Sequence, residues 1–281
     1  MTTIDWITPK IKKILLFFAL LGPGLVFCQV QKGKVISTEN GNGVGFVNIG
    51  IIGKNVGTVS DQDGNYTIDL ENIYDHDSLR FSMIGYQSRV FLVSQFRENP
   101  LKEVYLKPIS YDLKEVKVVY HKPKEVRLGY PVTTNDLRSG FSYNDLGSEL
   151  GVKIRVKGEV KLKDISFNVA VCTFDSVTYR LNIYLMEGET VCDNILKKPI
   201  YTSFSKLDIN KPITLDLSQY SIVVEGNILI TLEIYRNLGQ GRLLFNTTYF
   251  TDVTYHKKTS EGTWTQSPGM IGMYLHGMVI R

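Results

Sequence analysis

The sequence predicts an all-β protein built from two consecutive β-sandwiches. Sixteen tyrosines and thirteen phenylalanines, together with many valines and isoleucines, favour strands over helices. Residues 55–68 contain two runs of alternating polarity on either side of an acidic turn, which is the pattern of a β-hairpin. Similar short runs recur along the chain with no helical period between them. This spacing is typical of antiparallel sandwiches.

The hairpin in residues 55–68 can be assigned residue by residue. Val56, Thr58 and Ser60 fall on one face of its first strand, and Gly57, Val59 and Asp61 fall on the other. Residues 61–64 supply the turn, because Gly64 can adopt a positive φ and the two carboxylates can accept bonds from nearby backbone N–H groups. Tyr66 and Ile68 then begin a second strand with one apolar face.

The first 28 residues have the pattern of a secretory signal peptide. Three lysines, at positions 10, 12 and 13, precede an apolar stretch over residues 14–27 that is too short for a membrane span. Cleavage after Cys28 would start the mature chain at Gln29. The alternative is a lipid anchor on Cys28, against which the bulky Phe27 argues. No later segment is apolar enough to span a membrane as a helix, and the formal net charge of +4 is too weak to indicate nucleic-acid binding.

The N-terminal unit, residues 29–119, contains a regular succession of short strand patterns. An Asn-Gly-rich turn over residues 39–43 separates the first two. The expected strands are 29–36, 44–52, 57–60, 66–70, 79–83, 88–93, 101–106 and 114–119.

Several motifs in this unit resemble the carboxypeptidase-regulatory-like domain. They are Gly33-Lys34-Val35, Gly45-Phe46-Val47-Asn48-Ile49, residues 57–66, residues 79–86 and residues 113–118. The resemblance implies a transthyretin-like seven-stranded β-sandwich. It also implies an accessory role in the envelope of a Gram-negative bacterium, where such domains begin exported proteins, including outer-membrane receptors. It does not imply peptidase activity.

The second sandwich is expected over residues 148–281, after a linker over residues 120–147 that contains Pro123 and Pro131. In its first strand Val152, Ile154 and Val156 alternate with cationic residues. Eight or nine antiparallel strands of this kind favour a jelly roll.

No catalytic or metal-binding pattern stands out. None of the four histidines, at positions 76, 121, 256 and 276, has the Glu and second His of a zinc peptidase at the required spacing. There is no Gly-x-Ser-x-Gly elbow and no phosphate-binding loop. Asp61 and Asp63 differ from an EF-hand loop because Gly64 occupies position 4 rather than 6, so a capped turn is expected there. We therefore predict a protein without catalytic residues, cofactor or metal.

Three features are candidates for binding or covalent linkage. Trp264, with Tyr249 and Tyr255 nearby in sequence, could stack on sugar rings, or Trp264 could pack into its own sandwich. Cys172 and Cys192 form an even pair that could be a disulfide in an oxidising compartment, or Cys172 could be a small buried residue. A cationic stripe is either a solvated sheet face or a site for anionic lipid, polysaccharide or an acidic partner; its members are Lys153, Arg155, Lys157, Lys161 and Lys163.

These observations lead to one functional expectation and one alternative. We expect a non-catalytic accessory protein, exported to the periplasm or associated with the outer membrane, that docks on an outer-membrane or secretion protein. The alternative is a carbohydrate-binding protein that uses the C-terminal jelly roll.

Overall fold

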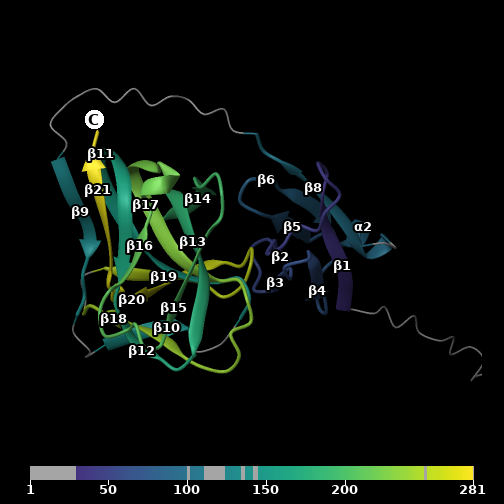
Figure 1. Cartoon of the computed structure of the whole chain (residues 1–281). Coiled ribbons are helices and arrows are strands. Elements are labelled where there is room, and N and C mark those ends of the chain that lie inside the picture. Colours follow the sequence, from purple (N-terminus) through teal and green to yellow (C-terminus); the bar gives the residue numbers. More distant parts are fainter. Residues whose placement is uncertain are drawn as a thin grey trace, which may run out of the picture.

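The computed structural model describes residues 30–99, 102–110, 124–133, 137–141, 145–249 and 252–280. Almost every element is a strand, which confirms the all-β class, and two units lie side by side (Figure 1). The predicted signal peptide, Cys28 and the expected strand 114–119 lie outside the described residues. Within the described ranges, no helix has the length and apolar character needed to cross a membrane.

The N-terminal unit is a sandwich of two four-stranded sheets, with strand orders β4-β1-β8-β6 and β3-β2-β5-β7. Eight strands are observed, one more than the seven-stranded sandwich that the family resemblance implies, and β6 and β7, on either side of Ser88, belong to different sheets. A short helix, α2 (Val93–Glu98), was not anticipated. The strands are β1 (Val30–Ser37), β2 (Asn48–Ile51), β3 (Gly57–Val59), β4 (Asn65–Asp69), β5 (Ser78–Ser82), β6 (Tyr86–Gln87), β7 (Arg89–Leu92) and β8 (Glu103–Pro108).

Alternate residues of these strands fill the N-terminal core. Tyr66 on β4 and Phe81 on β5 are buried, and their rings meet edge to face at 5.4 Å. Phe96 of α2 packs on both rings, so the helix closes one end of the core. Its two buried residues, Val93 and Phe96, are three positions apart and therefore share one helix face.

The C-terminal unit consists of a ten-stranded sheet and a three-stranded sheet, β10-β18-β12, in a sandwich-like arrangement of unequal layers. Its strands are β9 (Lys124–Tyr130), β10 (Leu137–Phe141), β11 (Ser148–Phe167), β12 (Val169–Cys172), β13 (Ser176–Glu187), β14 (Thr190–Asn194), β15 (Ile200–Ser205), β16 (Ile213–Asp216), β17 (Val223–Ile234), β18 (Leu243–Thr247), β19 (Val253–Lys257), β20 (Trp264–Pro268) and β21 (Met273–Val279). A single-turn 3₁₀ helix, η1 (Ser218–Tyr220), precedes β17.

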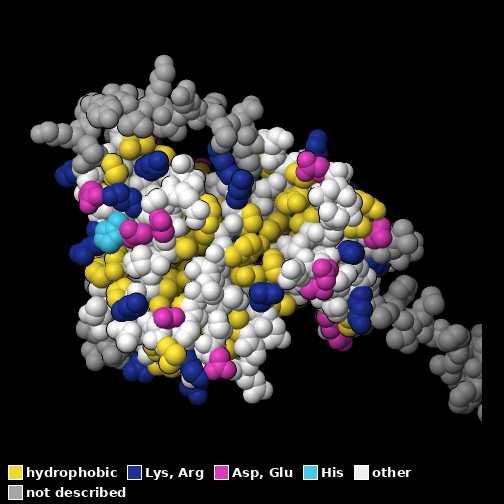
Figure 2. Space-filling model, viewed as in Figure 1, with side chains coloured by type: hydrophobic (Ala, Val, Ile, Leu, Met, Phe, Trp, Pro, Cys, Tyr) yellow, Lys and Arg dark blue, Asp and Glu magenta, His cyan; other side chains and the backbone are white. Residues whose placement is uncertain are grey.

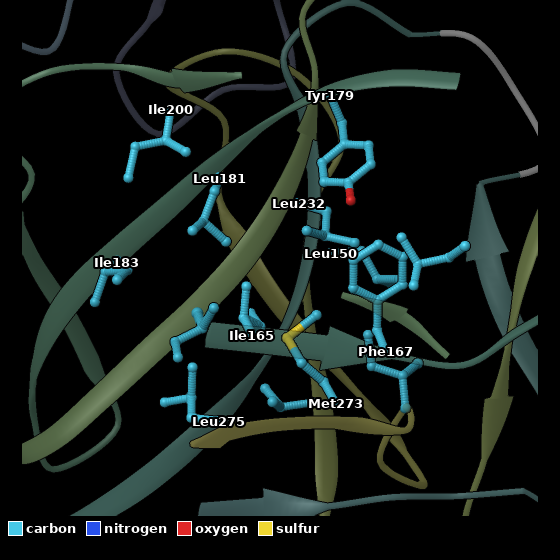
Figure 3. Close-up of a cluster of buried hydrophobic side chains, with 14 of the residues drawn as sticks. Leu150, Ile165, Phe167, Tyr179, Leu181, Ile183, Ile200, Leu232, Met273 and Leu275 are labelled. Atoms are coloured by element: carbon cyan, nitrogen blue, oxygen red, sulfur yellow. The ribbon is translucent and has the colours of Figure 1, made fainter. Parts of the chain in front are cut away.

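The long strand β11 organises this unit. On one side it pairs with β17 and then β16, and on the other with β19 and then β21. A bulge between Val156 and Val160 bends the strand where these partners change. Apolar side chains from β11, β13, β17 and β21 meet in the core that the bend encloses (Figure 3). Phe167 lies at its centre, with edge-to-face contacts to Tyr179 at 5.5 Å and Phe245 at 5.7 Å.

The predicted linker over residues 120–147 is wrong for much of its length. Residues 124–130 are strand β9, which pairs with β21 along all seven residues, and residues 137–141 are strand β10, which pairs with β18. Both strands belong to the C-terminal unit. Pro131 directly follows β9, and Gly129 and Gly140 lie within the two strands.

The two units are joined by the turn between β19 and β20, residues 258–263, which we call the β19–β20 turn. Its Ser260 is fully buried against Gly50 of β2 and Gly57 of β3. These two glycines lie opposite each other in the antiparallel β2–β3 pair. A Cβ atom on Gly50 would stand 2.1 Å from the Ser260 carbonyl oxygen, and one on Gly57 would stand 2.4 Å from it. The missing side chains therefore create the slot that the turn occupies.

Candidate binding cleft between the two units

A buried ionic cluster of Glu149, Arg180, Glu233 and Lys257 lies where the C-terminal unit faces the N-terminal unit. Arg180 of β13 and Glu233 of β17 are opposite each other in the ladder, and two guanidinium nitrogens donate to the carboxylate at 2.9 and 2.7 Å. The same guanidinium donates to the Phe46 carbonyl oxygen at 2.7 Å and to Asn48 Oδ1 at 2.8 Å. Arg180 thus links its own sheet to the N-terminal sandwich.

Charge compensation sets the protonation of this pair. Burial alone disfavours both charged forms. For Arg180 the Glu233 charge outweighs burial, so its pKa lies above the ordinary value. For Glu233 burial is likewise outweighed, here by the Arg180 charge and hydrogen bonds, so its pKa lies below the ordinary value. Both groups are therefore ionised at neutral pH.

Glu149 and Lys257 form the second half of the cluster. The two charged groups are 2.5 Å apart, and the carboxylate also accepts hydrogen bonds from Thr231 at 2.5 Å and Tyr184 at 3.0 Å. Burial, the largest cause, and the nearby Glu233 charge raise the pKa of Glu149 despite Lys257. Burial lowers the pKa of Lys257, but the two carboxylates outweigh it and the net shift is upward.

A cleft of about 550 Å³ opens beside this cluster, between the two units. This interdomain cleft has one wall from the N-terminal unit, centred on β5 and residues 83–88, and another from β13, β14 and the β19–β20 turn. Arg80 is 3.6 Å from Glu261 across the cleft, and Ser82 Oγ donates to Glu261 at 2.6 Å. Much of the lining is polar, and its polar residues include Asn48, Gln87, Asn182, Asp193 and Asn194. Such a lining favours a polar ligand over an apolar one.

Trp264, one of the predicted binding residues, lies in the wall of this cleft. Its ring meets Tyr184 edge to face at 5.8 Å, and the Lys257 ammonium lies over it at 4.8 Å. The residue is partly exposed and occupies the first position of β20, opposite Lys257. The indole is therefore held in place on one side and open to the cleft on the other.

The structure does not bring the three predicted aromatic residues together at this site. Tyr255 is only 1% exposed, packs under Trp264 in a small cluster with Met186 and Leu229, and donates from its hydroxyl to Glu189. It cannot stack on a ligand, because Trp264, Met186 and Leu229 cover its ring. Tyr249 is 54% exposed but does not line the cleft.

The predicted disulfide between Cys172 and Cys192 is not formed, and both thiols are free. Cys172 belongs to β12 in the three-stranded sheet, whereas Cys192 belongs to β14 at the edge of the large sheet. Cys172 donates weakly to the Phe174 carbonyl oxygen, and Cys192 lines the cleft.

The capped-turn prediction for Asp61 is confirmed. Its Oδ1 accepts the backbone N–H of Asp63 at 2.9 Å and of Asn65 at 2.8 Å. Across the described ranges no group of three or more His, Cys, Asp or Glu side chains has metal-binding geometry. His76 stacks on Tyr74, and His276 bonds Asp164 at 2.8 Å.

Sequence reasoning missed the ionic cluster. Arg180 and Glu233 sit within alternating runs, where charged positions normally indicate a solvent face. One signal was present, since Glu149, Arg180 and Glu233 each lie in strands with apolar residues on both sides. A sheet face on which paired strands carry opposite charges need not be solvent-exposed, because a second unit can cover it and bury the charges.

Comparison with known proteins assigns the N-terminal unit. Residues 31–118 match the CarboxypepD_reg-like domain family, and none of the curated proteins matches the chain. A VP2 subviral particle of infectious bursal disease virus is 10% identical, with a TM-score of 0.16, over 89% of this chain and 64% of its own. A structure of the Gx strain of that virus is 12% identical, with a TM-score of 0.15 and the same two coverages.

This chain spans 64% of the length of those viral structures, and at such TM-scores the similarity supports no argument. The family match is different, because it covers every strand from β1 to β8 and includes the motifs quoted above. The matching family is of a regulatory, non-catalytic type. Residues 31–118 therefore match the CarboxypepD_reg-like domain family, and a second β-unit follows them in the chain.

Proposed function

We propose that this is a non-catalytic accessory protein of the bacterial cell envelope that docks on an outer-membrane or secretion protein through its N-terminal unit. The observation that carries the proposal is an exposed apolar edge on that unit. Val90 and Leu92 on the outer face of β7 are 52% and 42% exposed, and Tyr105 of β8 is 46% exposed. Arg89 donates to the Tyr105 carbonyl oxygen, which places the two strands next to each other.

The position of β7 supports a specific mode of docking. It is the last strand of its sheet, and within the described residues it pairs only with β5. An open sheet edge can accept a strand from another protein, and apolar residues beside it add contact area. Figure 2 shows hydrophobic side chains gathered over the junction of the two units and across the N-terminal unit. A strand of the partner protein added to β7 would cover this edge.

A photo-crosslinking amino acid at position 90 tests the docking proposal in intact cells. We expect a covalent adduct with an outer-membrane or secretion protein, identified by mass spectrometry, and its loss in the variant Leu92→Asp. The matched control carries the crosslinker at Leu207, which is 80% exposed on the C-terminal unit. Equal crosslinking from both positions, or none from position 90, would contradict the proposal.

Carbohydrate binding is the second candidate, and the placement of Trp264 favours it. An indole ring in the wall of a polar cleft offers a stacking surface, and the neighbouring amide and carboxylate groups can bond sugar hydroxyls. The other tryptophan is Trp6, so a protein that starts at residue 29 has Trp264 as its sole indole fluorophore.

Titration with a panel of oligosaccharides should change this fluorescence if the cleft binds a glycan. We expect glycan binding, measured by calorimetry, to be lost in Trp264→Leu and kept in Tyr249→Ala, which removes an exposed aromatic ring outside the cleft. Binding that survives Trp264→Leu would contradict this assignment.

A further inference from the structure

A second cavity, which we call the apolar groove, lies in the C-terminal unit at the seam between β9, β21 and β11. It has a volume of about 490 Å³, within the range of small-molecule sites. Figure 1 shows these three strands on the side of the C-terminal unit opposite the N-terminal unit. Its seven lining residues are Lys124, Val126, Leu128, Arg155, Lys157, Val160 and Val279.

The strand pairing explains why the seam is open. On this side of β11, β19 pairs only as far as Val152 and β21 pairs only from Val160 onward. Between these points lies the bulge, and no described strand covers this side of the chain. Among the described strands, β9 pairs only with β21, so one of its edges is unpaired. Residues of β9 line the cavity together with Arg155 and Lys157 of the uncovered stretch of β11.

The floor of the groove is apolar. Val126 and Leu128 alternate along β9 with Glu125 and Arg127, and both pack against the main core together with Val279. Val160 of β11 is buried beneath them. An unbranched hydrocarbon chain could lie on this floor and remove these side chains from water.

The rim of the groove is cationic. Lys124, Arg155 and Lys157 are all exposed, and no carboxylate belongs to the lining. These rim cations are Lys124 of β9 and two members of the cationic stripe, and they differ from the stripe members Lys153 and Lys163. Lys153 pairs with Glu189 at 2.6 Å and Lys163 pairs with Glu125, whereas the described residues provide no ion pair for the three rim cations.

Two acidic residues flank this rim, and neither neutralises it. Glu125 lies next to Lys124, but alternation along β9 puts it on the opposite face, where it binds Lys163. Glu159 lies in the bulge and does not line the groove. The rim therefore retains an excess of positive charge above an apolar floor.

We propose that the apolar groove binds a single anionic amphiphile, an acyl chain with a carboxylate or phosphate head. The chain would lie on Val126, Leu128 and Val160, and the head would accept hydrogen bonds from Arg155 and Lys157. A neutral amphiphile has no negative charge to pair with the cationic rim, and a free inorganic anion has no apolar chain to cover the floor. Charge complementarity and apolar burial are both required. The inference is independent of the docking and glycan proposals, which concern other surfaces.

Calorimetric titration of the whole purified protein with dodecanoate, below its micelle concentration, tests the proposal. We expect one dodecanoate per chain, with affinity that falls as salt is raised because the rim contacts are ionic. Dodecanol and acetate serve as probes that keep only the chain or only the head, and each should bind much more weakly. In Arg155→Gln/Lys157→Gln the affinity for dodecanoate should fall about tenfold or more, the loss expected when charge-assisted hydrogen bonds are removed.

The matched control is Lys161→Gln, which removes an exposed cation from the same strand but outside the groove. It should bind dodecanoate as the unmodified protein does. All of these side chains are exposed, so an unchanged thermal midpoint will show that the fold is retained. The proposal would be overturned if the double variant bound dodecanoate with unchanged affinity, or if dodecanol bound as tightly as dodecanoate. It would also be overturned if the protein bound anionic phospholipid vesicles but not monomeric dodecanoate. That last result would indicate a membrane-contact surface.

Discussion

Arg180 connects the two units because its guanidinium has hydrogen-bond partners in both. Glu233 compensates its charge within the C-terminal sheet, and the Phe46 carbonyl oxygen and Asn48 receive its remaining donors. The Phe46 backbone has a φ of 60°, in the left-handed region that non-glycine residues rarely adopt. Its ring packs against Tyr235 at 4.8 Å and Tyr201 at 5.7 Å, and those two rings also contact each other. These ring contacts hold Phe46 where its carbonyl oxygen meets Arg180.

Substitution of Arg180 alone should be far more damaging than substitution of the pair. Arg180→Met leaves the buried Glu233 carboxylate without its main counter-charge, so we expect a loss of about 3–5 kcal/mol in the free energy of unfolding. Arg180→Met/Glu233→Met should recover a large part of this loss. Chemical denaturation of the three proteins measures both effects. A double variant no more stable than the single one would contradict this account.

Acidification should weaken the contribution of Glu233. Because the pKa of Glu233 is lower in the folded protein than its ordinary value of 4.5, its stabilising effect is complete above pH 4.5 and is lost as the pH falls below it. The stability gap between the unmodified protein and Glu233→Gln should therefore narrow below pH 4.5. Burial and the Glu233 charge raise the pKa of Glu149, so Glu149 takes up its proton at a higher pH than Glu233 does, and the narrowing below pH 4.5 reports Glu233. A gap that stays constant between pH 7 and pH 3 would refute this prediction.

Asp61 should matter for stability and not for ligand binding. Asp61→Ala removes the acceptor for the N–H groups of Asp63 and Asn65, with an expected cost of about 1 kcal/mol in unfolding free energy. Asp61→Asn retains an acceptor oxygen and should cost less. Asp63→Ala, in the same turn, is the control, and a larger loss there than at Asp61 would contradict the capping role. Denaturant midpoints compare the three variants.

At the scale of elements, the β19–β20 turn positions both the junction and the cleft. Gly53 N–H donates to the Glu261 carbonyl oxygen at 3.0 Å, and Thr263 Oγ1 donates to the Gly53 carbonyl oxygen at 2.7 Å. Both bonds anchor the part of the turn that follows Ser260. Trp264 follows immediately, so displacement of the turn would also displace the indole.

Gly50→Val should displace the β19–β20 turn from the space above Gly50 and Gly57. The first atom of the new side chain would fall 2.1 Å from the Ser260 carbonyl oxygen, and the ladder position on β2 leaves it no other direction. We expect Trp264 emission to shift to longer wavelength as water reaches the ring, and the radius of gyration from small-angle scattering to increase. Thr263→Val removes one flanking bond without a clash and should give a smaller shift. Unchanged emission in Gly50→Val would contradict the slot.

The elements also show where sequence patterns succeed and fail. Expected strands in the N-terminal unit lie within a few residues of those observed, because each has one buried face and ends at a turn residue. The sequence pattern marked alternation only from Val152 to Val156 in the first strand of the C-terminal unit, yet β11 runs on to Phe167 and its ladder with β17 continues through the bulge. Strand β9 has only Val126 and Leu128 as an apolar signal between prolines. Its stability comes from β21, a partner about 150 residues away that local periodicity cannot reveal.

The cleft illustrates a similar division between local and long-range information. The aromatic character of Trp264 was visible in the sequence, and the structure places it at the cleft. Tyr255 has the same side-chain chemistry as Tyr249, and it is buried because Met186, Leu229 and Trp264, which are distant from it or on another strand, pack around it. The charged pairs of the ionic cluster depend on strand register, which is set by contacts between distant segments.

At the scale of the whole molecule, the two units should unfold together. Buried charges, the glycine slot and ring contacts of Phe46 all span the junction, in contrast to the looser contacts typical between domains. Calorimetry should therefore give one transition for the unmodified protein and two for Gly50→Val, in which the units are uncoupled. Two well-separated transitions in the unmodified protein would show that the junction contributes little.

The glycine slot also has a consequence for the order of assembly. Ser260 bonds Asn48 across 212 positions of sequence, so the slot is synthesised long before the turn that fills it. The N-terminal sandwich can fold by itself, but its Gly50 and Gly57 face must remain uncovered until nearly the whole chain has emerged and the C-terminal sheet has formed. Insertion of the β19–β20 turn between these glycines is then the last step of folding. A chain in which this step fails would leave the Gly50 and Gly57 face available to other proteins.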